Sequence, residues 1–264
     1  MPAIRRMFEF WYLLPLGLAI ATVAVSAGIS GSNFWLPLFL LLLALPPRLA
    51  FWLALTTMVF GSSSGVIRNL RAGTIDGHLA WRLLIVAVPA ALVGSVTASF
   101  VNDRPLLLGF AAIAGAGGIR VLRSSDDPPT CETTDLGRIR LAAAAGGLLE
   151  GLVITGCGAV LVPTMMRRHP APPDVLVGTS VLVVFACALT ASLSRLDAQM
   201  LAAIETHRQQ MLQVLPFAVP GVIVGGQLGP RIAQRLRLAT LKRYFGVLLL
   251  VVSVLVIALA LGKS

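Results

Sequence analysis

Two clusters of glycine and small polar residues interrupt long apolar stretches of this 264-residue chain. The first lies at 28–33 and is followed by Pro37, and the second lies at 154–158 and is followed by Pro163. Glycine permits a sharp chain break, and a helix that restarts after a break presents unpaired N–H groups and the positive end of its dipole. Such helix starts bind anions without a formal cation. The two clusters therefore predict an anion site.

Side chains around the breaks, and hydroxyls near the start of the helix that follows each break, supply further hydrogen-bond donors. The candidate substrate-binding residues are Ser30, Gly31, Ser32, Asn33, Thr56, Thr57, Gly156, Cys157, Gly158, Thr179 and Ser180. The competing interpretation is that small residues mark close helix packing. Two clusters at corresponding positions, each followed by a half-length helix and a proline, favour a site over packing alone. The GxxxG spacings at 147–151 and 221–225 predict helix contact and no chemistry.

Glu150 is the one carboxylate inside an apolar run. An ionisable group within a membrane segment is costly and by default functional, so Glu150 is the candidate for proton coupling. On a continuous helix it would lie about 12 Å from Gly158, at 1.5 Å per residue. We therefore expect it in a vestibule leading to the cavity and not at the break itself. The alternative is a vestibule residue without a mechanistic role.

Enzymatic chemistry is disfavoured. Residues 61–65 fit the G-x-S-x-G motif of hydrolases, but no histidine lies inside an apolar run to activate a serine. The three cysteines, Cys131, Cys157 and Cys187, show neither pair spacing nor a metal-binding motif. We predict no catalytic residue, no metal and no cofactor, and a protein that is not an enzyme.

The elements that position these residues must lie in a membrane. The chain is 57% hydrophobic and only 12% charged, against roughly 25% charged in soluble domains. This composition excludes a soluble globular enzyme, a disordered chain and a secreted disulfide domain. The net charge of +10 comes from Arg and Lys in short stretches between apolar runs, which argues against nucleic-acid binding. The chain is predicted to be an all-α polytopic membrane protein.

The chain divides into two homologous membrane repeats, 11–122 and 139–262, joined by a polar linker at 123–138. Six apolar runs are long enough, or nearly so, to cross a ~30 Å hydrocarbon layer. They are 49–67, 83–100, 106–122, 175–194, 212–228 and 244–262. If each broken segment dips in and returns to the same side, two thirds of the 21 basic residues share one side. If each crosses, the split is more even. The positive-inside bias favours re-entry, and hence inverted repeats and about eight helices.

The residues around the breaks resemble those of the TauE/SafE family of sulfite exporters and organosulfonate permeases. The second half matches more closely, with a glycine-rich stretch at 147–158, then Pro163 and the Gly-Thr-Ser of 178–180. The first half keeps Gly28, Gly31 and Pro37. Serines replace glycines at 30 and 32, Cys157 replaces another, and Glu150 replaces a small residue. The resemblance implies about eight membrane helices and transport of a small sulfur-containing or carboxylate anion.

We therefore predict a secondary transporter of a small anion, above all sulfite or an organosulfonate, in a bacterial-type plasma membrane. The alternatives are a passive anion channel or facilitator and a non-transporting membrane scaffold subunit. The expected partners are the anionic substrate, the lipid bilayer and, through Glu150, protons, with no nucleic acid. Transport direction, coupling ion and the formation of a homodimer stay open.

Overall fold

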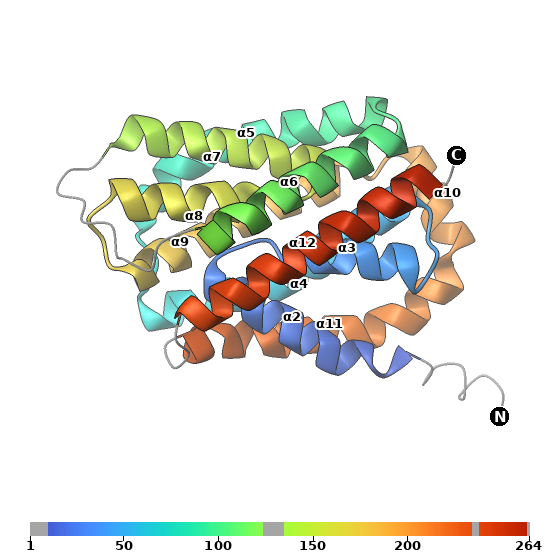
Figure 1. The fold of residues 1–264 in the computed structure, drawn as a ribbon, viewed down its shortest axis with the longest axis horizontal. Helices are drawn as coiled ribbons and strands as arrows, with labels where there is room; N and C mark the ends of the chain where they lie inside the picture. The colour runs from blue at the N-terminus through green and yellow to red at the C-terminus, as the bar shows by residue number, and fades with distance from the viewer. Residues whose placement is uncertain (1–9, 124–134, 234–237, 263–264) are drawn as a thin grey trace.

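The computed structural model describes residues 10–123, 135–233 and 238–262. Over these residues the chain forms α-helices joined by short connections, without strands (Figure 1). The helices are α2 (Leu13–Ala27), α3 (Ser32–Leu41), α4 (Pro47–Ala72), α5 (Gly77–Phe100), α6 (Asp103–Arg123), α7 (Leu136–Val153), α8 (Cys157–Arg168), α9 (Pro173–Ser194), α10 (Ala198–Thr206), α11 (Arg208–Ala233) and α12 (Leu238–Gly262). The prediction of an all-helical chain is confirmed.

Four of these helices, α4, α5, α9 and α11, are long and apolar enough to cross a membrane. They contain the predicted runs 49–67, 83–100, 175–194 and 212–228. The runs 106–122 and 244–262 fall in the helices α6 and α12. The broken segments form shorter helices, because the small-residue clusters interrupt them.

Several helix starts follow directly from the sequence. Pro46 and Pro47 begin α4, and Pro172 and Pro173 begin α9. Proline suits the first helical position, where its missing N–H would have no intrahelical partner. At the start of α5 the Asp76 side chain accepts hydrogen bonds from two backbone N–H groups at 3.0 Å. These caps fix where the membrane-spanning helices begin.

The first broken segment folds as a helical hairpin. Gly28, with a φ of 68°, ends α2 in the left-handed conformation. The chain then reverses direction. Gly31 lies beside Ala24, whereas Trp35, one turn further along α3, lies beside Gly17 near the start of α2. Figure 1 shows α3 returning toward the end of the molecule at which α2 begins.

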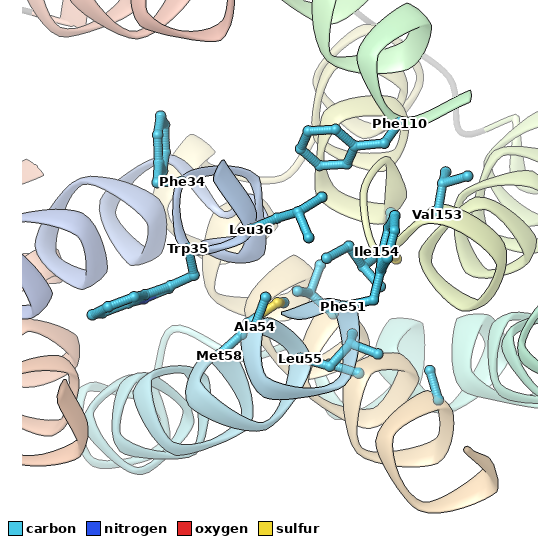
Figure 2. Close-up of a cluster of buried hydrophobic side chains, with 14 of the residues drawn as sticks. Phe34, Trp35, Leu36, Phe51, Ala54, Leu55, Met58, Phe110, Val153 and Ile154 are labelled. Carbon is cyan, nitrogen blue, oxygen red and sulfur yellow. The ribbon is translucent and has the colours of Figure 1, made fainter. Parts of the chain in front are cut away.

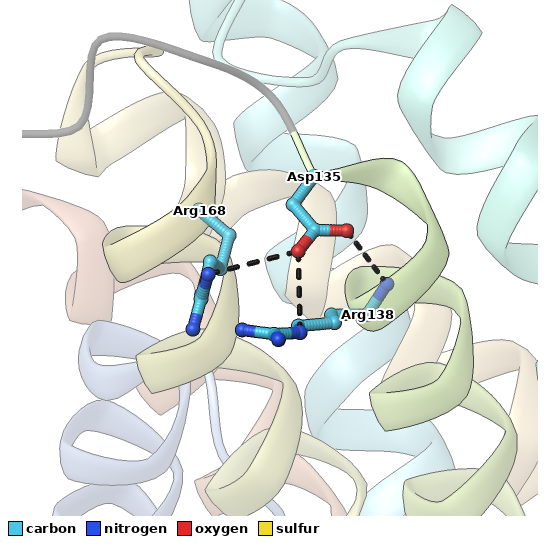
Figure 3. A network of polar contacts seen from close by, with 3 residues as sticks. All are labelled: Asp135, Arg138 and Arg168. Carbon is cyan, nitrogen blue, oxygen red and sulfur yellow. Dashed lines mark hydrogen bonds and ion pairs between the residues drawn. The ribbon is translucent and has the colours of Figure 1, made fainter.

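The second broken segment also reverses direction, and its two helices, α7 and α8, pack along one another more closely than α2 and α3 do. Close to the break, Gly146 of α7 lies against Cys157 of α8. At the far end, the backbone N–H of Asp135 donates to the carbonyl of Arg168 at 3.1 Å. The Asp135 carboxylate also pairs with Arg168 at 3.6 Å and with Arg138 at 3.3 Å (Figure 3). The last residue of α8 is thus tied to the residue that precedes α7.

Corresponding helices of the two halves pack in corresponding ways. α2 packs along α11 as α7 packs along α5, while α6 packs along α12 and α4 along α9. The first two pairs approach closely, because Gly147 and Gly151 of α7 face carbonyl oxygens of α5, and Gly221 and Gly225 of α11 face carbonyl oxygens of α2. A Cβ on any of these four glycines would overlap the neighbouring backbone. The predicted role of both GxxxG spacings in helix contact is confirmed.

The apolar core surrounds the breaks. Figure 2 shows a cluster in which side chains of α3, α4 and α6 meet those at the end of α7. Phe51 and Phe110 pack edge to face, with ring centroids 6.4 Å apart. Trp35 and Phe39 stack within α3 at 5.2 Å. These large rings exclude solvent from the neighbouring break residues, which are almost completely buried.

Candidate functional site

The two chain breaks meet in the interior. Gly158, in the first turn of α8, packs directly on the backbone of the first break. A Cβ at Gly158 would overlap the carbonyl oxygen of Gly28 and lie 2.5 Å from the Cα of Ile29. From α9, the Ser180 hydroxyl donates to the same Gly28 carbonyl at 3.0 Å. The half-helices that were predicted to start at the breaks therefore start against one another.

A buried polar network joins the breaks. The Ser30 hydroxyl donates to Glu150 Oε1 at 2.7 Å and also contacts Met58 Sδ at 2.8 Å. It forms a hydrogen bond with the Ser32 hydroxyl, which in turn donates to the Ile154 carbonyl. Both serines and Glu150 are at most 1% exposed. Side chains that are 120 residues apart in sequence thus share one hydrogen-bonded chain.

Glu150 lies at the break and not in a vestibule, so the predicted position about 12 Å from Gly158 along a straight helix is wrong. Glu150 Oε2 accepts a hydrogen bond at 3.2 Å from the backbone N–H of Cys157, the first residue of α8. The straight-helix estimate failed because α7 ends at Val153 and the chain turns back. The start of α8 therefore lies beside the last turn of α7.

The backbone of the second break adopts unusual dihedral angles. Gly156 has a φ of 122°, and Ile154 has a φ of 57°. A β-branched residue at positive φ is a conformational outlier that costs on the order of 1–3 kcal/mol and persists only where its surroundings enforce it. The Ile154 carbonyl, near the end of α7, lies within hydrogen-bonding distance of both serine hydroxyls, at 3.4 Å from Ser30 Oγ. The serines of the first break thereby hold the strained turn of the second.

Three predicted site residues do not join this network. Thr56 bonds to Ser192 of α9 at 3.0 Å, and Thr57 donates to a carbonyl of its own helix at 2.8 Å. The Thr179 hydroxyl accepts from the backbone N–H of Asp76 at 3.0 Å, in the α4–α5 connection. These threonines support helix contacts, and their role as substrate ligands stays a prediction.

The remaining candidates flank the network. Gly31 and Gly156 are the residues directly before α3 and α8. Asn33, in the first turn of α3, is buried, and its side-chain oxygen lacks a hydrogen-bond partner within the described ranges. The first turns of both half-helices therefore carry predicted site residues.

Sequence reasoning missed two features of the site. Cys157, the first residue of α8, and Cys187 of α9 are buried free cysteines whose thiols lie close together, although no spacing paired them. Cys131 lies outside the described residues. Arg195, which directly follows α9, is buried and donates to the carbonyls of Gly151 and Leu152 at 2.5 and 3.1 Å. In the sequence Arg195 is one of several basic residues that border apolar runs, so nothing local marked it as buried.

The arrangement offers hydrogen bonds and one buried carboxyl group. In the part of the chain that the structure describes, no group of three or more His, Cys, Asp or Glu side chains could hold a metal ion. The serine motif at 61–65 lies inside α4, where Ser62 and Ser63 donate to carbonyls of their own helix. This is not the strand-to-helix turn that the hydrolase motif requires.

These features define a multi-pass helical membrane protein with a buried polar centre. The chain matches the family described as Sulfite exporter TauE/SafE over residues 13–256 and belongs to this family. A curated relative, the Probable membrane transporter protein YunE of Bacillus subtilis (strain 168), is 23% identical over 270 residues, which is 92% of this chain and 96% of the relative. No solved structure matches the chain. Family membership identifies the chain as a membrane transporter.

Proposed function

We propose that this chain is a secondary transporter of a small oxyanion, above all sulfite or an organosulfonate, which binds where the two broken helices meet. The hydrogen bond from the Cys157 N–H to Glu150 Oε2 carries the proposal. It places a carboxylate-type oxygen on the first N–H of a half-helix, a position suited to a substrate oxygen. Ser30, Ser32 and Ser180 supply hydroxyls within the same break region.

Glu150 links anion binding to a proton. An ionised Glu150 would place its own negative charge at the start of α8 and repel a substrate anion there. Neutralising the carboxyl group by protonation removes this competition. Anion and proton therefore bind together, and a monovalent anion crosses without moving net charge. Moving that charge alone against the membrane potential costs about 2.3 kcal/mol per 100 mV.

Counting hydrogens supports a proton on Glu150. Three oxygen–oxygen contacts connect Glu150 to Ser30, Ser30 to Ser32, and Ser32 to the Ile154 carbonyl. Each contact needs one hydrogen, and the two serine hydroxyls supply only two. A proton on the Glu150 carboxyl group would supply the third: the direction of the first hydrogen bond would then reverse, with Glu150 donating to Ser30, Ser30 to Ser32, and Ser32 to the Ile154 carbonyl. Loss of that proton leaves one contact between two oxygens without a hydrogen, so the breaks must rearrange.

The two repeats are proposed to be inverted in the membrane. The hairpin form of both broken segments and the corresponding packing of α2 with α11 and α7 with α5 support this arrangement. Each half then has three crossings, and the connections containing 71 and 235 face the cytoplasm while position 48 faces outside. Position 235 lies outside the described residues. The proposed location is a bacterial-type plasma membrane, which the Bacillus subtilis source of the curated relative supports.

Accumulation by the purified chain in liposomes tests the proposed function. With an imposed pH gradient, a carrier accumulates sulfite or a permanently ionised sulfonate above the external concentration. A passive facilitator equilibrates the anion and stops, and a scaffold subunit gives the flux of empty liposomes. Equilibration without accumulation, or no flux for any anion, would overturn the proposal.

A further inference from the structure

Arg195 is a buried cation whose charge no carboxylate balances within the described residues. Its side chain is 7% exposed, and no described Asp or Glu lies within 4.0 Å of the guanidinium. One terminal nitrogen donates to the Gly151 and Leu152 carbonyls, and the guanidinium lies 5.8 Å from the centre of the Phe51 ring. Its Nε has no hydrogen-bond partner within the described ranges. Buried charges are normally paired, so Arg195 lacks its counter-charge.

A cavity of ≈ 80 Å³ opens beside this side chain. Arg195 lines it together with Phe51 and Ser99, and with Arg48, Asp197 and Gln199. A water molecule needs about 10–15 Å³ of such volume, so the cavity has room for several waters or a small oxyanion. It lies at the end of the molecule where α4 and α6 begin and α9 ends, away from the Asp135–Arg168 end of the α7–α8 hairpin.

The other charged groups at this cavity already have partners. Arg48 pairs with Asp103 at 3.4 Å and donates to Gln199 at 3.2 Å. The Asp197 carboxylate accepts from the backbone N–H of Met200 at 2.7 Å and thereby caps α10. The cavity is therefore lined by the Arg195 side chain, whose guanidinium charge no described carboxylate balances, beside a hydroxyl and an amide.

We infer that this cavity is a docking site for the substrate oxyanion, with Arg195 as its cation, at the end of the molecule opposite the Asp135–Arg168 pair. The identity of the anion rests on the proposed function; the site itself rests on the unpaired charge. Guanidinium groups bind oxyanions with directional, charge-assisted hydrogen bonds. The carbonyls that Arg195 holds belong to the last turn of α7, shortly before the strained Ile154. Arg195 thus connects the outer cavity to the central break.

Anion binding to the purified full-length chain tests the docking site. Thermal unfolding, followed by intrinsic tryptophan fluorescence, is measured against sulfite and sulfate concentration for the wild type, Arg195→Gln and Arg195→Lys. A bound anion raises the unfolding midpoint. We expect Arg195→Gln to weaken anion binding about tenfold or more, as removal of a charged hydrogen-bond donor does, and Arg195→Lys to retain part of it. The matched control is Arg208→Gln. Arg208 is an exposed arginine at the start of α11.

A second measurement tests the docking site even if Arg195→Gln does not fold. In Ser99→Cys, sulfate should slow labelling of the cavity thiol by a membrane-impermeant reagent when Arg195 is present. Equal anion affinity in wild type and Arg195→Gln, or no protection of position 99, would overturn the docking site while leaving transport through the breaks intact. Stabilisation by phosphatidylglycerol vesicles but not by sulfite or sulfate would also overturn it, in favour of a lipid phosphate. Absence of any sulfite transport by the wild type would instead refute the proposed function.

Discussion

Replacing Glu150 with glutamine removes the proton-carrying group from the breaks while preserving the size of the side chain. The glutamine oxygen can still accept from the Cys157 N–H, and its NH₂ can donate to Ser30, whose hydroxyl is 2.7 Å from the carboxyl oxygen. Because both contacts survive, we expect the free energy of unfolding to change by no more than about 1 kcal/mol. Glu150→Ala is the contrasting variant, since it leaves the buried Cys157 N–H unpaired at a cost of about 1–3 kcal/mol.

The transport consequence of Glu150→Gln follows from charge. In the wild type a monovalent anion moves with a proton, so the accumulation ratio follows the pH gradient and not the membrane potential. In the variant the anion moves alone. At about 2.3 kcal/mol per 100 mV, its accumulation ratio should change roughly 50-fold per 100 mV.

The assay is uptake of a permanently ionised sulfonate into liposomes, with the pH gradient and the potential set independently. A sulfonate is preferred to sulfite because its own protonation does not complicate the proton count. Glu150→Gln protein that still follows the pH gradient at the wild-type rate would refute the coupling role, and Glu150 would then be a structural partner of Ser30 and the α8 start.

Three further predictions concern the fold around the site. Gly158→Ala should lower the unfolding temperature and abolish transport, because its Cβ overlaps the first break. Gly117→Ala should do neither, since the nearest atom to its added Cβ is 3.9 Å away. Thermal unfolding and liposome uptake of the two variants are compared. Cysteines placed at 48 and 71 should be labelled from opposite sides of the membrane, and labelling from one side would contradict re-entry. Asp135→Asn should reduce stability by less than about 1 kcal/mol because its ion pairs are solvent-exposed, and a larger loss in chemical denaturation would contradict that estimate.

Much of the architecture was readable from the sequence. Low charge and long apolar runs predicted the membrane class, and the small-residue clusters predicted both breaks. The GxxxG spacings predicted close packing because only glycine allows a neighbouring carbonyl oxygen to approach so near the helix axis. These features depend on local composition, which a single sequence displays directly.

The composition of the polar centre was harder to predict. Glu150 was placed by extrapolating a straight helix, whereas the turn at 154–156 brings the start of α8 back to it. Whether a hydroxyl joins the polar network depends on where it lies: Ser30 lies in the break itself, whereas Thr57 lies inside α4 and donates to its own helix. The burial of Arg195 depends on how α9 packs against α7, a long-range contact without a local signature.

Uptake of sulfite by liposomes containing Ser32→Ala protein tests the central claim most directly. Ser32 is fully buried, contacts Ser30 and donates to the Ile154 carbonyl, and its truncation adds no bulk. Ser63→Ala is the matched control, because that hydroxyl bonds only within α4 among the described contacts and faces the exposed surface. We predict that Ser32→Ala inserts and folds but loses most sulfite uptake, while Ser63→Ala transports like the wild type. Equal uptake by both variants would contradict a transport site at the meeting of the two breaks.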